Sequence, residues 1–249
     1  TIAITKMKSW WDTGQKVFVL AGRGGTGKTT IVDRAIQEFE GLNSSQVKFA
    51  LPTHKAKNVI RKAAKRYSKD QFDTIAKMLG HKQKGYNEIT GQANFEADSQ
   101  KASAALQQLQ DDGIQLIVID EASMVGDTHT EDILKLADTL PGNVRILFMG
   151  DNVQLPPPTG PRNKITLSAV FANLMGLPTP VEIELNDGNS HKLIERMRQK
   201  NESPILGFTD ILANAVEYIF AKALENPRWY SGNANFKVKL PNVPENKKH

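Results

Sequence analysis

The chain has 249 residues, enough for one large domain or for one domain with an appendage. Hydrophobic residues make up 39% and charged residues 24%, and the formal net charge of +5 favours a polyanionic partner only slightly. The absence of cysteine excludes disulfides, thiolate zinc sites and cysteine nucleophiles. No apolar run approaches the length of a membrane span and no signal peptide heads the chain, so we expect a cytoplasmic protein without a membrane partner.

Four short apolar runs, at residues 17–21, 47–51, 116–119 and 144–149, have the composition of buried parallel strands. Helix-compatible segments at residues 29–39, 55–66 and 130–140 lie between them. Strands that alternate with helices predict an α/β fold in which helices flank a parallel sheet. Polar signatures follow each of the strands, at the edge where open α/β sheets bind their ligands.

The remaining segments divide the chain into three predicted parts. Residues 81–110 break the strand-helix alternation with a small hairpin at 86–96 and a polar helix at 102–110, which indicates an insertion. After three prolines, residues up to about 190 read as irregular, and helices are expected at 191–200 and 205–224 before a basic tail. We therefore predict one ATP-binding lobe at 1–80 and 111–190, an inserted region at 81–110, and a separate C-terminal part at 191–249.

Residues 22–29 read Gly-Arg-Gly-Gly-Thr-Gly-Lys-Thr and fit the phosphate-loop pattern G-x-x-x-x-G-K-[ST] without a mismatch. The alternative is a chance glycine-rich turn, which the strand before it and the helix after it disfavour. In such a loop Lys28 reaches the β- and γ-phosphates and the hydroxyl of Thr29 ligates Mg²⁺. The sequence predicts nucleotide binding by Gly22, Gly24, Gly25, Thr26, Gly27, Lys28, Thr29 and Thr30.

A second signal is the apolar strand at residues 116–119 that ends in Asp120-Glu121, which is the Walker B arrangement. We expect Asp120 to hold Mg²⁺ and Glu121 to orient or deprotonate the attacking water. Acidic residues also follow strands as helix caps, and the phosphate loop upstream favours the functional reading. Ser123 and Met124 lie just downstream, and their residue types allow either a packing role or a helix-capping role.

The third signal is the segment at residues 150–157, which reads Gly-Asp-Asn-Val-Gln-Leu-Pro-Pro after another strand. A glutamine here can bind a γ-phosphate and sense its loss, which makes Gln154 a candidate catalytic sensor. Taken alone, a proline-stiffened loop with a solvent-facing glutamine is the simpler interpretation.

In this order and spacing, the three motifs resemble those of superfamily 1 DNA helicases, and most closely the RecD-like branch with its Dda-type phage accessory helicases. The resemblance implies a RecA-like P-loop NTPase that hydrolyses ATP with Mg²⁺ as it moves 5′ to 3′ on single-stranded DNA and opens duplex junctions. It also implies a monomer in a bacterial or phage-infected cell, with other replication or repair proteins as candidate partners.

The same resemblance suggests DNA contacts. Residues 50–57 resemble the family's motif Ia and residues 73–80 its motif Ib, although Ala76 stands where many relatives have histidine. The predicted hairpin corresponds to the family's duplex-splitting pin, where Phe95 is either a base-stacking residue or a core aromatic under the hairpin. The DNA-binding residues implied in this way are Pro52, Thr53, His54, Lys55, Thr74 and Phe95.

Residues 193–200 resemble motif IV, whose arginine reaches across the ATP cleft to the γ-phosphate. Arg198 matches it best as a catalytic arginine, with Arg196 as the alternative. Downstream we find no motif V or VI, and no upstream glutamine for adenine, so the resemblance covers residues 6–200, the first motor lobe and the start of the second. We expect Mg·ATP binding with little unwinding by this chain alone. The alternative is a helicase-derived module that binds ATP or DNA without motor activity.

Overall fold

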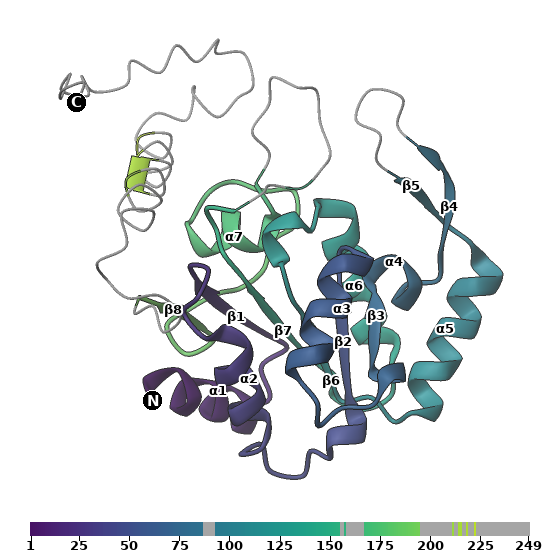
Figure 1. Cartoon of the computed structure of the whole chain (residues 1–249), viewed down its shortest axis with the longest axis horizontal. Helices are drawn as coiled ribbons and strands as arrows, with labels where there is room; N and C mark the ends of the chain where they lie inside the picture. Colours follow the sequence, from purple (N-terminus) through teal and green to yellow (C-terminus); the bar gives the residue numbers. More distant parts are fainter. Residues whose placement is uncertain are drawn as a thin grey trace, which may run out of the picture.

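The computed structural model describes residues 1–86, 93–154, 157 and 167–194, together with residues 211, 214, 215, 218 and 222. Its centre is a six-stranded sheet in the order β3-β2-β6-β7-β1-β8, in which every neighbouring pair is parallel (Figure 1). The strands are β1 Val17–Gly22, β2 Val47–Leu51, β3 Phe72–Thr74, β6 Leu116–Ile119, β7 Arg145–Gly150 and β8 Ser190–Leu193. The predicted α/β fold with a parallel sheet is thus confirmed.

Helices cover both faces of this sheet and divide the core into two layers. In β1, Phe18 and Leu20 point to one face, whereas Val19 and Ala21 point to the other. Side chains from the first three helices pack on the Phe18 face, and side chains from α4 to α7 pack on the Val19 face. The helices are α1 Ile2–Thr13, α2 Lys28–Ile36, α3 His54–Ala63, α4 Ile75–Met78, α5 Ser99–Asp111, α6 Asp127–Thr139 and α7 Ala169–Leu174, with short 3-10 helices η1 Ser44–Gln46, η2 Lys69–Gln71 and η3 Ala122–Met124.

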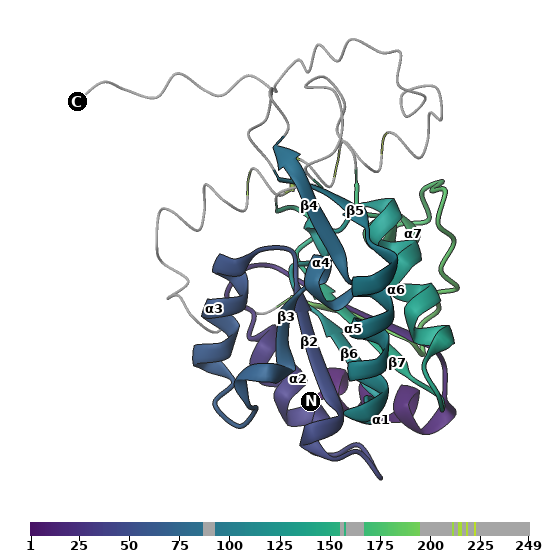
Figure 2. The same cartoon turned by 90° about the vertical axis from the view of Figure 1, so that its right-hand side faces the viewer.

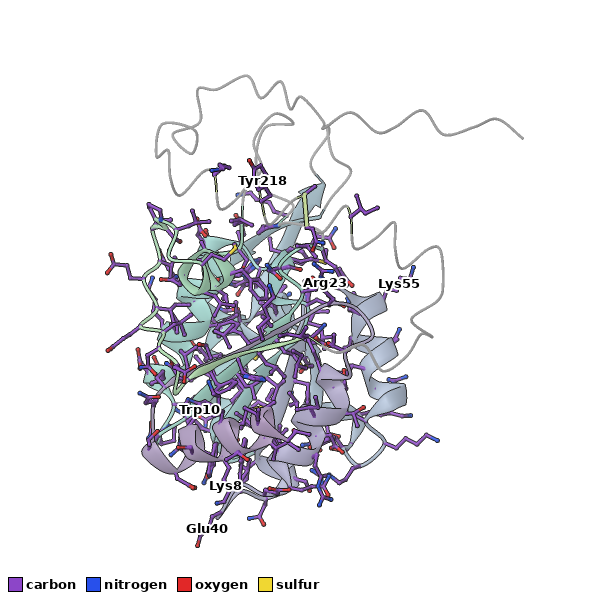
Figure 3. The ribbon with its side chains drawn as sticks, turned by 90° about the vertical axis from the view of Figure 1, so that its left-hand side faces the viewer. Lys8, Trp10, Arg23, Glu40, Lys55 and Tyr218 are labelled. Atoms are coloured by element: carbon purple, nitrogen blue, oxygen red, sulfur yellow. The ribbon has the colours of Figure 1, made fainter. Side chains whose placement is uncertain are left out.

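An aromatic cluster anchors α1, a helix that the sequence analysis did not predict. Trp10 is fully buried with its ring centroid 5.4 Å from that of Phe18, and Trp11 stacks on Phe39 at 4.8 Å. The guanidinium of Arg145 lies 4.1 Å from the centre of the Trp11 ring, a cation–π contact. Trp10 lies below Arg23 of the phosphate loop in Figure 3, toward the Lys8 and Glu40 end of the molecule. The cluster fixes α1 beneath the start of β1.

The two edge strands depart from the prediction. β3 is only three residues long and has a charged residue at its centre, Asp73, which is buried against the ammonium of Lys48 at 2.8 Å. β8 reads Ser-His-Lys-Leu and, within the part of the chain that the structure describes, pairs with β1 alone, so its polar side chains suit an edge position. The helix expected to begin at His191 is therefore wrong at its start, because backbone pairing with β1 makes residues 190–193 a strand. This strand crosses the predicted domain boundary at residue 191.

Two further segments complete the comparison. A hairpin is present, but its first strand, β4 His81–Tyr86, begins earlier than predicted, and the second, β5 Ala93–Ala97, pairs antiparallel to it. The hairpin rises from the end of the molecule opposite α1 (Figure 2). The segment expected to be irregular before residue 190 contains α7, which is held by buried Val170 and Phe171. Within the described ranges, no helix is long and apolar enough to cross a membrane.

Candidate functional site

The parallel sheet brings the sequence motifs to one edge. Parallel strands all point the same way, so the segments that follow β1, β2, β6 and β7 emerge from the same side of the sheet. These segments are the phosphate loop, the start of α3, the Asp120-Glu121 pair and the Gly150–Gln154 region. The labels of Arg23 in the loop and Lys55 on α3 lie toward the same end of the molecule (Figure 3).

The phosphate loop is closed by its own hydrogen bonds. The hydroxyl of Thr26 donates to the carbonyl of Arg23 at 2.8 Å, and the backbone N–H of Thr26 donates to the same carbonyl at 3.2 Å. Gly27 has φ of 81°, a left-handed conformation that favours glycine. At Gly22 a Cβ would lie 2.7 Å from the Thr26 hydroxyl, so only glycine fits. The predicted glycine-dependent turn is therefore present between β1 and α2.

Lys28 is the first residue of α2, and its ammonium lies over the loop. The Nζ atom donates to the carbonyl of Gly22 at 2.6 Å and to that of Arg23 at 3.2 Å. Thr29 follows in a half-buried position, and Thr30 is exposed. A cation above the loop at the N-terminus of a helix is the arrangement that favours an anionic phosphate.

Asp120 is a half-buried carboxylate at the end of β6. Burial raises its pKa to about 6; the neighbouring Glu121 charge also raises it, while the Glu121 N–H, donating at 2.8 Å, and the Lys28 charge lower it. A divalent cation would offset the cost of ionising this partly desolvated group. A carboxylate together with the hydroxyl of Thr29 provides the oxygen ligands that Mg²⁺ prefers. The donor set of this edge therefore fits Mg²⁺ with a nucleotide.

Glu121 has a strained backbone. Its φ of 54° and ψ of 41° place it in the left-handed region, and among the described residues it is the only non-glycine residue with positive φ. Such a conformation costs about 1–2 kcal/mol and is typical of functional positions. Glu121 precedes the short helix η3, inside which both Ser123 and Met124 lie. Capping is therefore the wrong interpretation for these two residues, and the buried Ser123 hydroxyl makes no hydrogen bond.

Asp151 belongs to the site but was not among the predicted site residues. Its carboxylate is buried and accepts hydrogen bonds from the backbone N–H groups of Gly24, at 2.9 Å, and of Val153, at 3.1 Å. The signal was present in the Gly-Asp pair that follows β7. Gln154 is exposed, and its amide nitrogen would lie 3.4 Å from a Cβ on Gly24. The loop after β7 thus lies against the phosphate loop.

The predicted DNA-binding threonines both cap helices. The hydroxyl of Thr53 accepts from the backbone N–H of Ala56 at 3.1 Å and caps α3, and that of Thr74 accepts from the N–H of Lys77 at 3.2 Å and caps α4. The two helices start next to each other because Leu51 pairs with Thr74 in adjacent strands. Thr53 is exposed, whereas Thr74 is buried. Only the first hydroxyl is placed to donate to a partner in solvent.

The other predicted DNA-side residues are placed as follows. His54 and Lys55 are exposed in the first turn of α3, and Pro52 is half-buried before it. Phe95 lies on β5 with 44% of its surface exposed, so the interpretation as a core aromatic is wrong. Arg198 and its alternative Arg196 lie outside the described residues.

Comparisons with known proteins agree with this arrangement. A family model described as an AAA domain matches residues 5–202. The ATP-dependent RecD2 DNA helicase of Deinococcus radiodurans is 27% identical over 144 residues, which make up 58% of this chain and 16% of that protein.

Two solved structures share the fold. The Pif1 helicase from Candida albicans superposes with a TM-score of 0.54 at 16% identity, over 86% of this chain and 43% of that one. A structure of two coordinating Pif1 helicases at forked double-stranded DNA gives a TM-score of 0.51 at 20% identity, over 85% and 48%. The chain spans about a sixth of the curated relative and less than half of each solved structure. The predicted resemblance is confirmed: the chain is related to a RecD2 DNA helicase, and it belongs to the AAA domain family.

Proposed function

We propose that this chain is the ATP-binding motor lobe of a RecD-like DNA helicase. In the whole protein it would couple Mg·ATP hydrolysis to 5′-to-3′ movement on single-stranded DNA and to opening of duplex junctions. The observation that carries the proposal is that the phosphate loop after β1 and Asp120 after β6 leave the same edge of the parallel sheet, with the ammonium of Lys28 over the loop. It supports a common site for the phosphate loop and the Walker B acid.

The nucleotide half of the proposal assigns a task to each group. The loop backbone at Gly24–Gly27 and the ammonium of Lys28 would hold the phosphates, with the positive end of α2 behind them. Thr29 and Asp120 would hold Mg²⁺, which neutralises phosphate charge when bound. Mg²⁺ binding would also keep Asp120 ionised despite its burial.

The hydrolytic half needs groups that act on water and on the γ-phosphate. Glu121 would orient the attacking water, and its strained backbone holds the carboxylate directly after Asp120. Gln154 would contact the γ-phosphate from the loop that Asp151 ties to Gly24. Arg198 would supply further positive charge to phosphoryl transfer, as its resemblance to the motif IV arginine suggests.

The DNA half rests on the start of α3. Thr53, His54 and Lys55 are exposed there, and the helix N-terminus carries partial positive charge. These groups suit phosphate and sugar contacts and not base readout, so we expect little sequence preference. Phe95, exposed on the hairpin, would stack on a base near the junction.

The test is DNA-stimulated ATP hydrolysis by the purified chain and by a longer version that extends into any downstream lobe. Lys28→Ala should abolish nucleotide binding, and Glu121→Gln should bind ATP without turning it over. Lys8→Ala is the matched control, because Lys8 is a half-exposed lysine at the opposite end of the molecule (Figure 3). ATP binding that DNA never accelerates in either version would favour the non-motor module instead.

A further inference from the structure

A cavity of about 350 Å³ lies beside the phosphate loop, at the β8 side of β1. Its walls include Ala21 of β1, Lys192 of β8, Asn152 after β7, and Leu174 and Met175 at the end of α7. Ala21 and Lys192 are direct partners in the parallel pairing, and Gly22 follows Ala21. The cavity therefore adjoins the first residue of the phosphate loop.

The position of the cavity matches the base end of a bound nucleotide. Asp120, the proposed Mg²⁺ ligand, ends β6, and β7 separates β6 from β1 in the sheet. The metal and γ-phosphate end therefore lies on the β6 side of the loop. A triphosphate that crosses the loop from there brings its ribose and base out on the opposite side, where β8 lies. The cavity volume is within the range of small-ligand sites.

Asn152 is a polar residue on the cavity wall with an unpartnered buried atom. Its side chain is 9% exposed, and its Oδ1 atom is buried without a hydrogen bond. A buried acceptor in this state costs free energy that a ligand N–H would recover. The neighbouring Asp151 is bonded to Gly24, so the backbone that carries Asn152 is tied to the phosphate loop.

The chemistry of the cavity suits adenine better than guanine. A carboxamide can accept from the 6-amino group of adenine and donate to the adjacent N7, whereas the same edge of guanine presents two acceptors. Leu174 and Met175 provide apolar contacts for the flat face of a base. Lys6 and Asp187, also on the wall, form an ion pair with each other, so their charges offset.

We propose that Asn152 recognises the 6-amino edge of adenine in this cavity and so makes the proposed motor lobe selective for ATP over GTP. The proposal rests on the proposed function, because it assumes that the phosphate loop holds a nucleoside triphosphate.

The experiment measures the dissociation constants of ATP, GTP and purine riboside triphosphate, which is ATP without its 6-amino group. The parent chain should bind ATP about tenfold more tightly than either of the other two. Asn152→Leu removes both hydrogen-bonding atoms at similar volume, so it should weaken ATP about tenfold, and it should weaken purine riboside triphosphate clearly less, because that nucleotide loses only the contact to N7. Asn58→Leu, on exposed α3, makes the same substitution away from the cavity and should change nothing.

Two results would overturn the proposal: equal binding of all three nucleotides by the parent chain, or a uniform loss for all three in Asn152→Leu. Asn152→Ala provides a second variant if the leucine disturbs folding, and thermal unfolding of each variant checks this. Lys28→Ala separates the two hypotheses, since it should abolish binding of all three nucleotides whatever Asn152 does. If Lys28→Ala binds the three nucleotides normally, the result contradicts the proposed function itself, whatever the Asn152 variants show.

Discussion

The backbone N–H of Gly24 donates to the carboxylate of Asp151 at 2.9 Å, which ties the phosphate loop to the segment after β7. Asp151 uses its other oxygen to accept from Val153, two residues before Gln154. One buried carboxylate therefore holds both the loop that would bind phosphate and the segment that would sense it.

Asp151→Ala should weaken both segments at once. It leaves the backbone N–H groups of exposed Gly24 and half-buried Val153 without their protein acceptor, and losing the two hydrogen bonds costs about 0.5–1.5 kcal/mol each. We expect a lower unfolding temperature and at least about a tenfold loss of ATP affinity. Asp151→Asn keeps one acceptor oxygen. Its stability in urea titrations and its ATP affinity should therefore lie between those of the parent chain and those of Asp151→Ala. Parent-like ATP affinity in a folded Asp151→Ala chain would show that the contact is only incidental.

Glu121 should show a trade between stability and activity. Glycine adopts its left-handed conformation without a Cβ clash, so Glu121→Gly should raise the free energy of unfolding by about 1 kcal/mol. It should also abolish hydrolysis, because the carboxylate is gone. Glu121→Gln keeps the strain and should abolish turnover, with only the smaller stabilising effect of removing the negative charge beside Asp120. Chemical denaturation and steady-state ATPase assays check both, and a destabilised glycine variant contradicts the strain argument.

Asp120 should make stability depend on pH when Mg²⁺ is absent. Its pKa is raised from 3.8 to about 6 in the folded chain, so on raising the pH the unfolded state loses its proton first. Stability therefore falls between about pH 4 and 6 and stays lower above pH 6. Asp120→Asn removes this effect and should gain roughly 1–3 kcal/mol at pH 7.5, and almost nothing near pH 4.

The measurement is urea unfolding of both chains in EDTA across this pH range. With Mg²⁺ and ATP present, the parent chain should become more stable than Asp120→Asn, because only the parent is stabilised by the bound ligand. The same pKa predicts that Mg·ATP binding by the parent weakens as the pH falls below about 6, because protons then compete with the metal. An Asn variant that is less stable than the parent at pH 7.5 in EDTA would refute the burial argument.

Thr53 and Thr74 should respond differently to loss of their hydroxyls. Both cap helices, so Thr→Val should cost about 0.5–2 kcal/mol of stability at either position. Only Thr53 is exposed, so only Thr53→Val should also reduce single-stranded DNA affinity. Thr→Ser is the control at each site, because it keeps the cap. Fluorescence anisotropy with labelled oligonucleotides distinguishes them, and equal DNA losses for both valine variants would count against the exposure argument.

The sequence by itself determined the parts of this protein that rest on contiguous residues. The phosphate loop, with Gly27 and Lys28 at fixed spacing, needs only a strand before it and a helix after it, and both are present. Asp120 follows a run of buried apolar residues whose composition predicts a central strand. Such local patterns also predicted the α/β class and the hairpin.

Only the tertiary structure decided the contacts between residues distant in sequence. The polar strand β8 is a strand because its backbone pairs with β1, and Asp73 is tolerated in β3 because Lys48 neutralises it. The bond from Gly24 to Asp151 and the burial of Thr74 likewise depend on chain segments that meet in the folded sheet. Hydrophobic periodicity and turn-forming residues can be recognised from neighbouring residues in the sequence. Strand partners, burial and charge compensation depend on which distant segments pack together in the folded chain.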